Sequence, residues 1–525
     1  MRVELRDSLE FLYSDSSVAD RPCEAMRVDV ARGGTASVHV LVNGVKKGAT
    51  LRATLERNGK RVPSATWFRL VDVPVEVNTG PVGFTEKEGG HNKFVARRAP
   101  FRVYDAMEPV GPAVQAASPT TALRLHLPIP VDARTGRENY DVRLSCGRET
   151  RTFSLTVVVH GPVIPPVGPG SFPYTNWFRL DLMAERHGLA PWSEAHWRMI
   201  RRYAEVMVHG RQNMFWVPLK DVFTAKGDTP VLNVGRLRRL VRTFTEAGMH
   251  YIEGGHVAGR TGGKWDVTTF DTNIVRERAT SVRGNAVLAH IGRQLMAEID
   301  RNGWRDRWIQ HATDEPTATC AVDYRILVGM VRRHFPGIPI LDATMEVSLV
   351  GSVDIWCPLA REYQKFRREF EAQRSLGDHV WFYTCCAPGG PWLNRLLDME
   401  LLRPALLGWG AARFGLEGFL HWGLNFYGEG QDPFRQSVTP HHRNTHLPAG
   451  DRNVVYPGTD GPWSSLRFEA QREGFEDYEL LKQLRSRDAK KTRANIRRAF
   501  RAFDDYTKDV KVLRAARRAL LMALG

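Results

Sequence analysis

The sequence has few cysteines and no long apolar run. Six cysteines in 525 residues lie scattered, without the spacing of a metal site: Cys23, Cys146, Cys320, Cys357, Cys385 and Cys386. We therefore expect free thiols, with a Cys23–Cys146 disulfide as the alternative in an oxidising compartment. No stretch approaches the roughly 18–20 apolar residues that span a bilayer, so the sequence predicts no membrane span.

The N-terminus also lacks the basic, apolar and small-residue order of a secretion signal. The sequence as it stands predicts a cytoplasmic protein, whereas a chain whose signal peptide had been removed would be secreted. No helix-turn-helix, zinc-finger or RNA-binding signature accompanies the basic residues, so we expect no nucleic-acid partner. The formal net charge of +16 favours anionic ligands, and an anionic polysaccharide is one hypothesis. Nothing in the sequence indicates an oligomeric state.

The pattern of apolar and turn-forming residues changes along the chain and divides it into regions. Short β-type runs broken by turns fill residues 1–160, which predicts an N-terminal antiparallel β-sandwich. Residues 161–170 are dense in proline and glycine, which predicts a linker. Short apolar runs alternate with helical patterns over residues 171–463, and amphipathic patterns over 464–525 predict C-terminal helices packed on that domain.

Residues 171–463 contain eight strand candidates separated by helical segments. Such alternation predicts a (β/α)₈ TIM-like barrel, with an open doubly wound sheet as the alternative, and hence a multidomain α/β fold. In a barrel, catalytic side chains lie where strands end and the following loops begin. The candidates are PYTNWFRLD, QNMFWVP, HYIEGG, RWIQHAT, IPILDAT, VDIWCP, HVWFYT and GFLHWG.

Two adjacent acids, Asp314 and Glu315 in HATDEP, follow the fourth of these candidates. One interpretation is a helix start, with the aspartate as cap and Pro316 in the first turn. Conventional glycosidases hold two carboxyls about 5–5.5 or 6.5–9.5 Å apart across the bond, an arrangement that neighbouring residues do not favour. Adjacent acids suit substrate-assisted hydrolysis, in which a 2-acetamido oxygen attacks the anomeric carbon. Glu315 would be the general acid/base, and Asp314 would stabilise the cyclised intermediate.

Three stretches, HATDEP, GLEGFLHWGLNFY and SLRFEAQREGFEDYELL, resemble glycoside hydrolase family 123 and its uncharacterised relatives. The resemblance implies a β-sandwich followed by a (β/α)₈ barrel. It also implies a β-N-acetylgalactosaminidase of carbohydrate metabolism that acts by substrate assistance. The family's acid pair corresponds to Asp314, which stabilises the acetamido group, and Glu315, which is the general acid/base.

Further polar and aromatic residues near strand ends are candidates for substrate binding. Tyr383 is expected to hold the acetamido carbonyl, and Trp422 to stack under the sugar, each against the alternative of plain packing. His311 is expected to be a buried, hydrogen-bonded histidine, with support of the acid pair as the alternative. The full set of substrate-binding candidates is Tyr383, Trp422, Asn425, Tyr427, His311, His256 and Asn213.

We expect neither a metal nor a cofactor. The histidines of PHHRNTH, residues 441–446 after its proline, have no cysteine or carboxylate at ligand spacing. Two other functions compete with substrate assistance. One is a glycosidase with a conventional carboxylate nucleophile, for which Glu253, Glu346 and Glu417 are candidates. The other is a protein that binds polysaccharide without cutting it.

Overall fold

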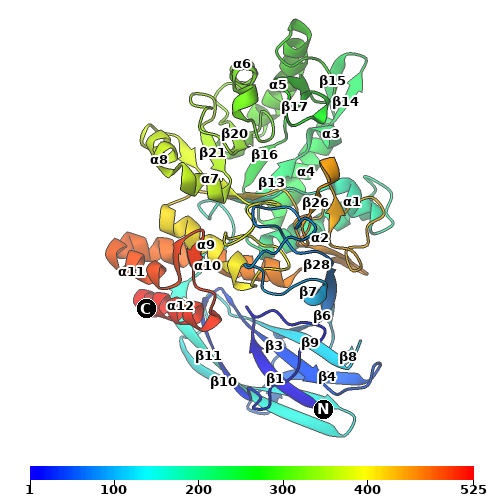
Figure 1. Cartoon of the computed structure of the whole chain (residues 1–525), viewed down its shortest axis with the longest axis vertical. Helices are drawn as coiled ribbons and strands as arrows, with labels where there is room; N and C mark the ends of the chain where they lie inside the picture. The colour runs from blue at the N-terminus through cyan, green and yellow to red at the C-terminus, as the bar shows by residue number, and fades with distance from the viewer. The chain divides into compact units, whose positions relative to one another are not determined.

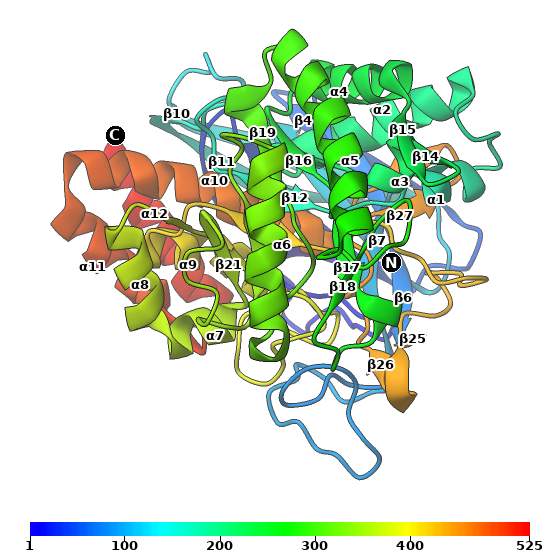
Figure 2. The same cartoon turned by 90° about the horizontal axis from the view of Figure 1, so that it is seen from above.

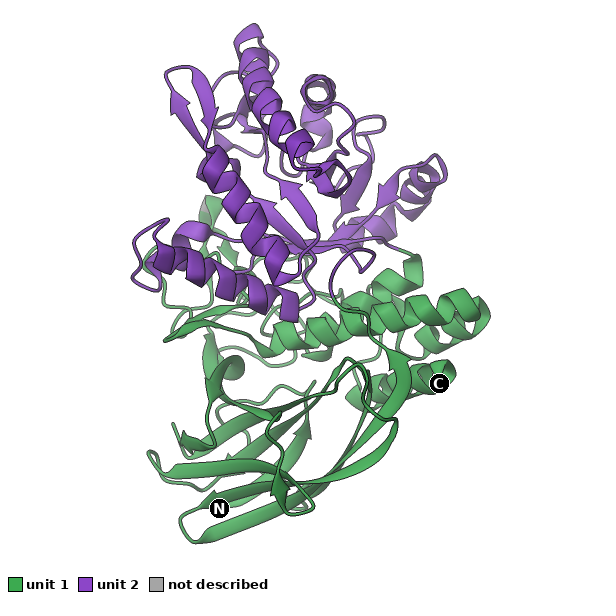
Figure 3. Cartoon of the chain, turned by 180° about the vertical axis from the view of Figure 1, so that it is seen from behind, with its two compact units in different colours: residues 1–166, 386–415, 425–525 green, residues 167–385, 416–424 purple. Residues whose placement is uncertain are grey.

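The computed structural model describes the backbone of residues 1–525 and every side chain except that of Arg443. The chain forms two compact units, coloured separately in Figure 3. Unit 1 comprises Met1–Pro166, Cys386–Gly415 and Asn425–Gly525, and unit 2 comprises Val167–Cys385 and Leu416–Leu424. The domain boundaries expected from the sequence stay predictions.

The N-terminal part of unit 1 consists of two sheets that share one apolar core. Alternating residues such as Val38, Val40, Leu125 and Val142 are buried there, which follows from the period-two pattern of the sequence. All strand pairs are antiparallel except β2 with β11. The first sheet has the order β1 (Arg2–Asp7), β3 (Thr35–Asn43), β9 (Thr120–Pro128), β6 (Thr66–Val75), β7 (Phe101–Val110). The second is β2 (Ala25–Arg32), β11 (Glu149–Val163), β10 (Gly136–Cys146), β4 (Thr50–Arg57), β5 (Lys60–Arg61), with β8 (Ala113–Gln115) beside β4.

Unit 1 also contains four helices from the C-terminal part of the chain, coloured yellow to red in Figure 1. These are α9 (Leu402–Phe414), α10 (Leu466–Arg487), α11 (Ala489–Ala499) and α12 (Val510–Leu524). Helices α9 and α10 approach closely because both carry glycine at the crossing. A Cβ on Gly408 would lie 1.9 Å from the carbonyl oxygen of Gly474. Three small hairpins complete the unit: β25 (Thr439–Pro440) with β26 (His446–Leu447), β27 (Tyr456–Gly458) with β28 (Gly461–Trp463), and β29 (Phe500–Ala502) with β30 (Asp505–Tyr506).

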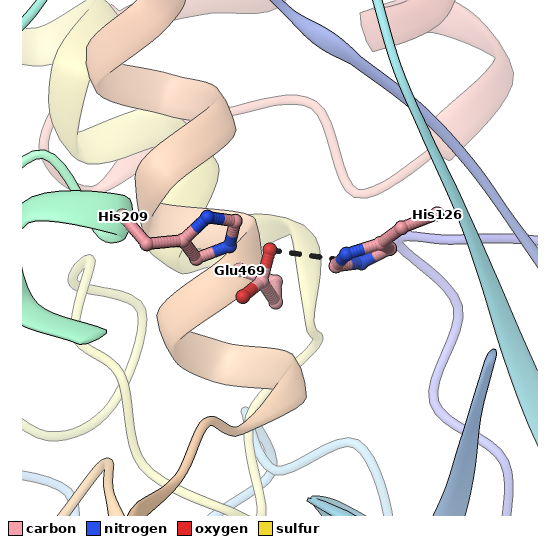
Figure 4. A group of neighbouring side chains, drawn as sticks. All are labelled: His126, His209 and Glu469. Carbon is pink, nitrogen blue, oxygen red and sulfur yellow. Dashed lines mark ion pairs between the residues drawn. The ribbon is translucent and has the colours of Figure 1, made fainter. Parts of the chain in front are cut away.

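Inside unit 1, helix α10 carries charged side chains that are almost fully buried. His126 Nε2 on β9 lies 3.7 Å from Glu469 Oε2 on α10, as the dashed line in Figure 4 marks. Glu469 also accepts a hydrogen bond of 2.9 Å from Arg472 Nε. His209, which the figure also draws, belongs to unit 2.

Unit 2 alternates strands with helices, as the sequence predicts. Helices α5 and α6 lie next to each other in Figure 2. The helices are α1 (Leu180–Glu185), α2 (Glu194–His209), α3 (Leu219–Val222), α4 (Val234–Ala247), α5 (Val282–Arg301), α6 (Ala321–His334), α7 (Ala360–Lys365) and α8 (Arg367–Ser375). Two hairpins, β14 (Phe223–Lys226) with β15 (Thr229–Leu232) and β17 (Ala258–Arg260) with β18 (Phe270–Thr272), interrupt the alternation.

The remaining strands of unit 2 are all parallel to their partners and form three separate three-stranded sheets. One is β12 (Tyr174–Asn176), β24 (Phe419–His421), β23 (Phe382–Tyr383). The second is β13 (Met214–Val217), β16 (Tyr251–Gly254), β19 (Trp308–Gln310), and the third is β20 (Leu341–Thr344), β21 (Ile355–Pro358), β22 (His379–Val380). Every expected strand segment contains a strand.

The mixed α/β, multidomain class is confirmed, but a closed TIM barrel is not found among the described residues. The physical reason is that each parallel strand has only two to four residues. So short a strand offers few ladder hydrogen bonds, and pairing between the three sheets is reduced to single bridges such as Gln310 with Ile340 and Leu359 with Tyr383. All six cysteines are free, and no described helix is long and apolar enough to cross a membrane.

Candidate active site

Asp314 and Glu315 lie in the loop after β19 and do not start a helix. A 3₁₀ turn begins at Ala318 with Thr317 as its cap, and α6 begins at Ala321, so the capping interpretation is wrong. The backbone of Glu315 has φ = 43°, in the left-handed region that non-glycine residues seldom adopt. Such conformations persist where the surrounding structure enforces them, often at functional sites.

Two side chains of unit 2 hold Glu315 in place. The hydroxyl of Tyr383, at the end of β23, donates a hydrogen bond to Glu315 Oε1. The guanidinium of Arg260, at the end of β17, donates to the carbonyl oxygen of Glu315. Arg260 itself lies over the ring of Trp265, 3.7 Å from its centroid. The structure thus brings Tyr383 to the acid pair, as a partner of the carboxyl.

Both acids bind protons more tightly than ordinary carboxyls. Desolvation by the surrounding protein, and then the charge of Glu315, raise the pKa of Asp314 to about 7, although the residue is exposed. Desolvation also raises the pKa of Glu315, against the lowering effect of the Tyr383 hydrogen bond. Because the two carboxyls repel each other's charge, the second proton leaves less readily than the first. The pair therefore holds a proton near neutral pH.

A row of charged side chains lies buried beside the pair. His311, directly after β19, places Nε2 2.7 Å from Glu253 Oε1 on β16 and Nδ1 3.0 Å from Asp342 Oδ1 on β20. All three side chains are fully buried. Burial lowers the pKa of His311, but the two carboxylate contacts outweigh it and raise the pKa to about 9. His311 is therefore the buried, hydrogen-bonded histidine that the sequence predicts.

Each carboxylate of this row has further donors. Glu253 accepts from Thr175 Oγ1 at 2.6 Å and from Trp177 Nε1 at 2.7 Å. Asp342 accepts from Tyr324 at 2.6 Å and from the backbone N–H groups of Ala312 and Thr313 at 3.2 and 3.3 Å. Asp342 thus anchors the backbone that leads into the acid pair.

Aromatic rings surround this row. Trp177 stacks on Trp216 with centroids 4.9 Å apart, and His256 meets both rings edge-on at 5.1 Å. Burial, and then His311, lower the pKa of His256, so its ring is neutral. Its Nε2 is buried with no hydrogen-bond partner among the described residues. An unsatisfied ring nitrogen of this kind is suited to a ligand's polar group.

His256, His311 and Asp342 each place one potential metal-ligand atom within 4.8 Å of the others. Both nitrogens of His311 already contact carboxylates, and a protonated imidazole offers no lone pair to a metal. The donor set therefore does not suit a metal ion.

The other residues predicted to bind substrate lie in both units. Trp422 follows β24 in unit 2 and is half-buried. Asn425 and Tyr427 are buried in unit 1, where the Tyr427 hydroxyl donates to the carbonyl of Val455 at 2.7 Å. Asn213 precedes β13 instead of following it, and its amide donates to the carbonyls of Gly168 and Ser171. The expectation that Asn213 ends a strand is wrong, because its amide anchors the loop before β12.

The three candidates for a conventional nucleophile have different surroundings. Glu417 precedes β24 and pairs with His379. Glu346 follows β20 in a turn that the Thr344 hydroxyl closes. Glu253 is buried and already accepts hydrogen bonds from a hydroxyl, an indole and an imidazole.

Residues 261–484 match the family description "Glycoside hydrolase 123, catalytic domain". Over these residues the resemblance to glycoside hydrolase family 123 is confirmed. A family 123 glycoside hydrolase from Clostridium perfringens, described in a study of glycolipid glycan hydrolysis, has the same fold. Its TM-score is 0.76 at 12% identity, over 99% of this chain and 98% of that one. No curated protein matches the chain.

Other solved glycosidases are similar only loosely. A GH10 xylanase with a bacterial Ig-like domain from termite gut has a TM-score of 0.35 at 9% identity, over 87% of this chain and 100% of that one. A β-D-glucuronidase from Dictyoglomus thermophilum has a TM-score of 0.36 at 9% identity, over 90% and 68%.

Of the buried row, Asp342 could not be identified from the sequence, and neither could the surrounding Trp177 and Trp216. Asp342, Trp177 and Trp216 each sit in or directly after a short apolar strand, where they resemble ordinary core positions. The family match begins at residue 261, after Glu253 and His256. A carboxylate inside each of two predicted strands, HYIEGG and IPILDAT, was the available signal, because a buried acid requires a partner.

Proposed function

We propose that this family 123 glycoside hydrolase cleaves β-linked N-acetylhexosamine, N-acetylgalactosamine in particular, with retention of configuration. The nucleophile would be the substrate's own 2-acetamido oxygen. The observation that carries the proposal is the adjacent pair Asp314 and Glu315, in which both pKa values are raised and one carboxyl is held by Tyr383.

In the first step the acetamido oxygen attacks the anomeric carbon while Glu315 gives its proton to the departing oxygen. Asp314, as a carboxylate, accepts a hydrogen bond from the acetamido N–H and stabilises the positive charge of the cyclised intermediate. In the second step a water attacks the anomeric carbon, Glu315 takes a proton from it, and the acetamido group re-forms. A pair that shares one proton near neutral pH supplies both protonation states at once.

The assignment of the pair is supported by what the other acids do. A nucleophilic carboxylate needs a free oxygen that faces the sugar, and the oxygens of Glu253 are occupied by donors. Tyr383 is assigned to orient Glu315, since its hydroxyl contacts that carboxyl. His256 is assigned to a polar group of the substrate because its buried Nε2 has no partner among the described residues. Trp422 keeps its predicted role under the sugar face, because it directly follows β24 and is half-buried.

We further propose that the parallel strands of unit 2 act as a barrel-like frame. Three sheets with single bridges between them keep the strands in chain order, and the acid pair and Tyr383 follow or end strands on the carboxyl side. The substrate would be an oligosaccharide or polysaccharide, or the glycan of a glycolipid as studied for the Clostridium perfringens enzyme.

The test is hydrolysis of aryl β-N-acetylgalactosaminide and β-N-acetylglucosaminide by wild type, Asp314→Asn and Glu315→Gln. A thiazoline that mimics the cyclised intermediate serves as inhibitor, and Glu205→Gln, an exposed carboxyl on α2, is the matched control. We expect loss of about 10²-fold or more in kcat for both pair variants, no loss for the control, and inhibition by the thiazoline. Two results together would instead identify a carboxylate nucleophile: turnover of glycosides that lack the acetamido group, and trapping of a covalent glycosyl-enzyme by a 2-fluoro sugar. Tight oligosaccharide binding without turnover, unchanged in Glu315→Gln, would indicate a binding protein.

A further inference from the structure

In the buried row Glu253–His311–Asp342, the positions of the two carboxylates determine how many ring nitrogens of His311 carry hydrogen. Each ring nitrogen of His311 faces a carboxylate oxygen, at 2.7 and 3.0 Å. A neutral imidazole has only one N–H, so its other nitrogen would turn a lone pair toward an oxygen lone pair. The geometry is satisfied when both nitrogens carry hydrogen.

Neither carboxylate in the row is suited to supply that hydrogen instead. The indole N–H of Trp177 can only donate, and it points at the same oxygen of Glu253 that His311 contacts. Backbone N–H groups and a tyrosine hydroxyl surround Asp342. The row therefore consists of two carboxylates and one imidazolium, and its net charge is −1.

The row lies against the backbone of the acid pair. His311 is three residues before Asp314, and Asp342 bonds the two N–H groups between them. The charge of His311 lowers the pKa of Asp314, whereas the charge of Asp342 raises it. The other charged groups that face Asp314 are Glu315 and Arg260, and those that face His311 are Glu253, Asp342 and the neutral His256.

We propose that His311 is a positioning residue that acts through Asp314. Held as an imidazolium between Glu253 and Asp342, it cancels one of two buried negative charges and so favours the ionised form of Asp314. This inference rests on the proposed function, because the ionised form of Asp314 is the form that stabilises the cyclised intermediate.

A merely structural role for His311 would tie three strands together without affecting the proton count of the pair. The two roles differ in how charge changes in the row act on catalysis. The row carries −1 in the wild type, −2 in His311→Gln, 0 in Glu253→Gln, and −1 again in the double variant. A structural role predicts losses that add up, whereas a charge role predicts shifts that cancel.

The experiment is the pH dependence of kcat/KM for wild type, His311→Gln, Glu253→Gln and the double variant, with Glu205→Gln as control. The acid limb reports ionisation of Asp314. We expect it to move up by about one pH unit in His311→Gln, down by a similar amount in Glu253→Gln, and back near the wild-type position in the double variant. Equal acid limbs in the folded variants would overturn the inference. If His311→Gln does not fold, the contrast between Glu253→Gln and the double variant still decides.

A second measurement does not depend on activity. In protein labelled with ¹⁵N-histidine, the His311 signals, identified by their loss in His311→Gln, should show two protonated nitrogens at pH 7.5. A neutral ring would overturn the inference. If the wild type cuts no hexosaminide, the proposed function fails, and titration of the ¹³Cγ signal of Asp314, which is absent in Asp314→Asn, tests the same shifts in the same variants.

Discussion

The hydroxyl of Tyr383 donates its hydrogen bond to the carboxyl of Glu315, across 68 residues of sequence. This contact joins the end of β23 to the loop after β19. It stabilises the ionised form of Glu315 and so opposes the effect of burial on that carboxyl.

Tyr383→Phe should therefore raise the pKa of Glu315. Because the proposed first step needs Glu315 protonated, the basic limb of the pH–kcat/KM profile is expected to move to higher pH, and kcat to fall about tenfold as orientation is lost. Steady-state kinetics between pH 5 and 9 measure both effects. A raised KM with an unmoved basic limb would show instead that Tyr383 holds the acetamido carbonyl.

Asp314→Asn should stabilise the folded protein at alkaline pH. The folded-state pKa of Asp314, about 7, lies above its ordinary value of 3.8, so the folded state loses stability as pH rises between those two values. Removing the acid removes that loss. Because the residue is exposed, solvent screening weakens the effect, and we expect a gain of only about 1 kcal/mol at pH 8 and none near pH 3.5. Urea unfolding at both pH values would detect it, and an equal effect at the two would contradict the assignment.

Asp342→Asn should destabilise unit 2 strongly. The change leaves His311 with one carboxylate and weakens the anchor of Ala312 and Thr313, and breaking a buried ion pair costs about 3 kcal/mol or more. Tyr324→Phe removes only one donor from Asp342 and should cost about 1 kcal/mol. Chemical unfolding followed by tryptophan fluorescence measures both variants. Similar costs for the two would mean that the ion pair adds little.

Gly408→Ala should disrupt unit 1, because its Cβ would lie 1.9 Å from a carbonyl oxygen of α10. Two packed backbones cannot move apart cheaply, so we expect a loss of about 3 kcal/mol or more. Gly329 on α6 is the matched control, since a Cβ there meets nothing within 4 Å. Gly329→Ala should stabilise by about 1 kcal/mol through helix propensity. Calorimetry of the two variants tests the contrast.

The eight strand segments of unit 2 and the two-sheet N-terminal part could be predicted from the sequence, because they depend on local periodicity. The sequence did not carry the buried row, because Glu253, His311 and Asp342 meet only through the pairing of β16, β19 and β20. Asn213 shows the same limit. A polar residue beside a strand is visible in sequence, but which end of the strand it occupies depends on where the first strand residue falls.

At Glu315 the left-handed backbone conformation favours another residue type, whereas the proposed function requires the carboxyl. Glycine or asparagine adopts φ = 43° more readily than glutamate, so conformational preference alone favours losing the carboxyl. A Glu315→Gly variant would then outlast the enzyme on heating while cutting nothing. The proposed acid/base is thus a position where a screen for thermal tolerance would select inactive proteins.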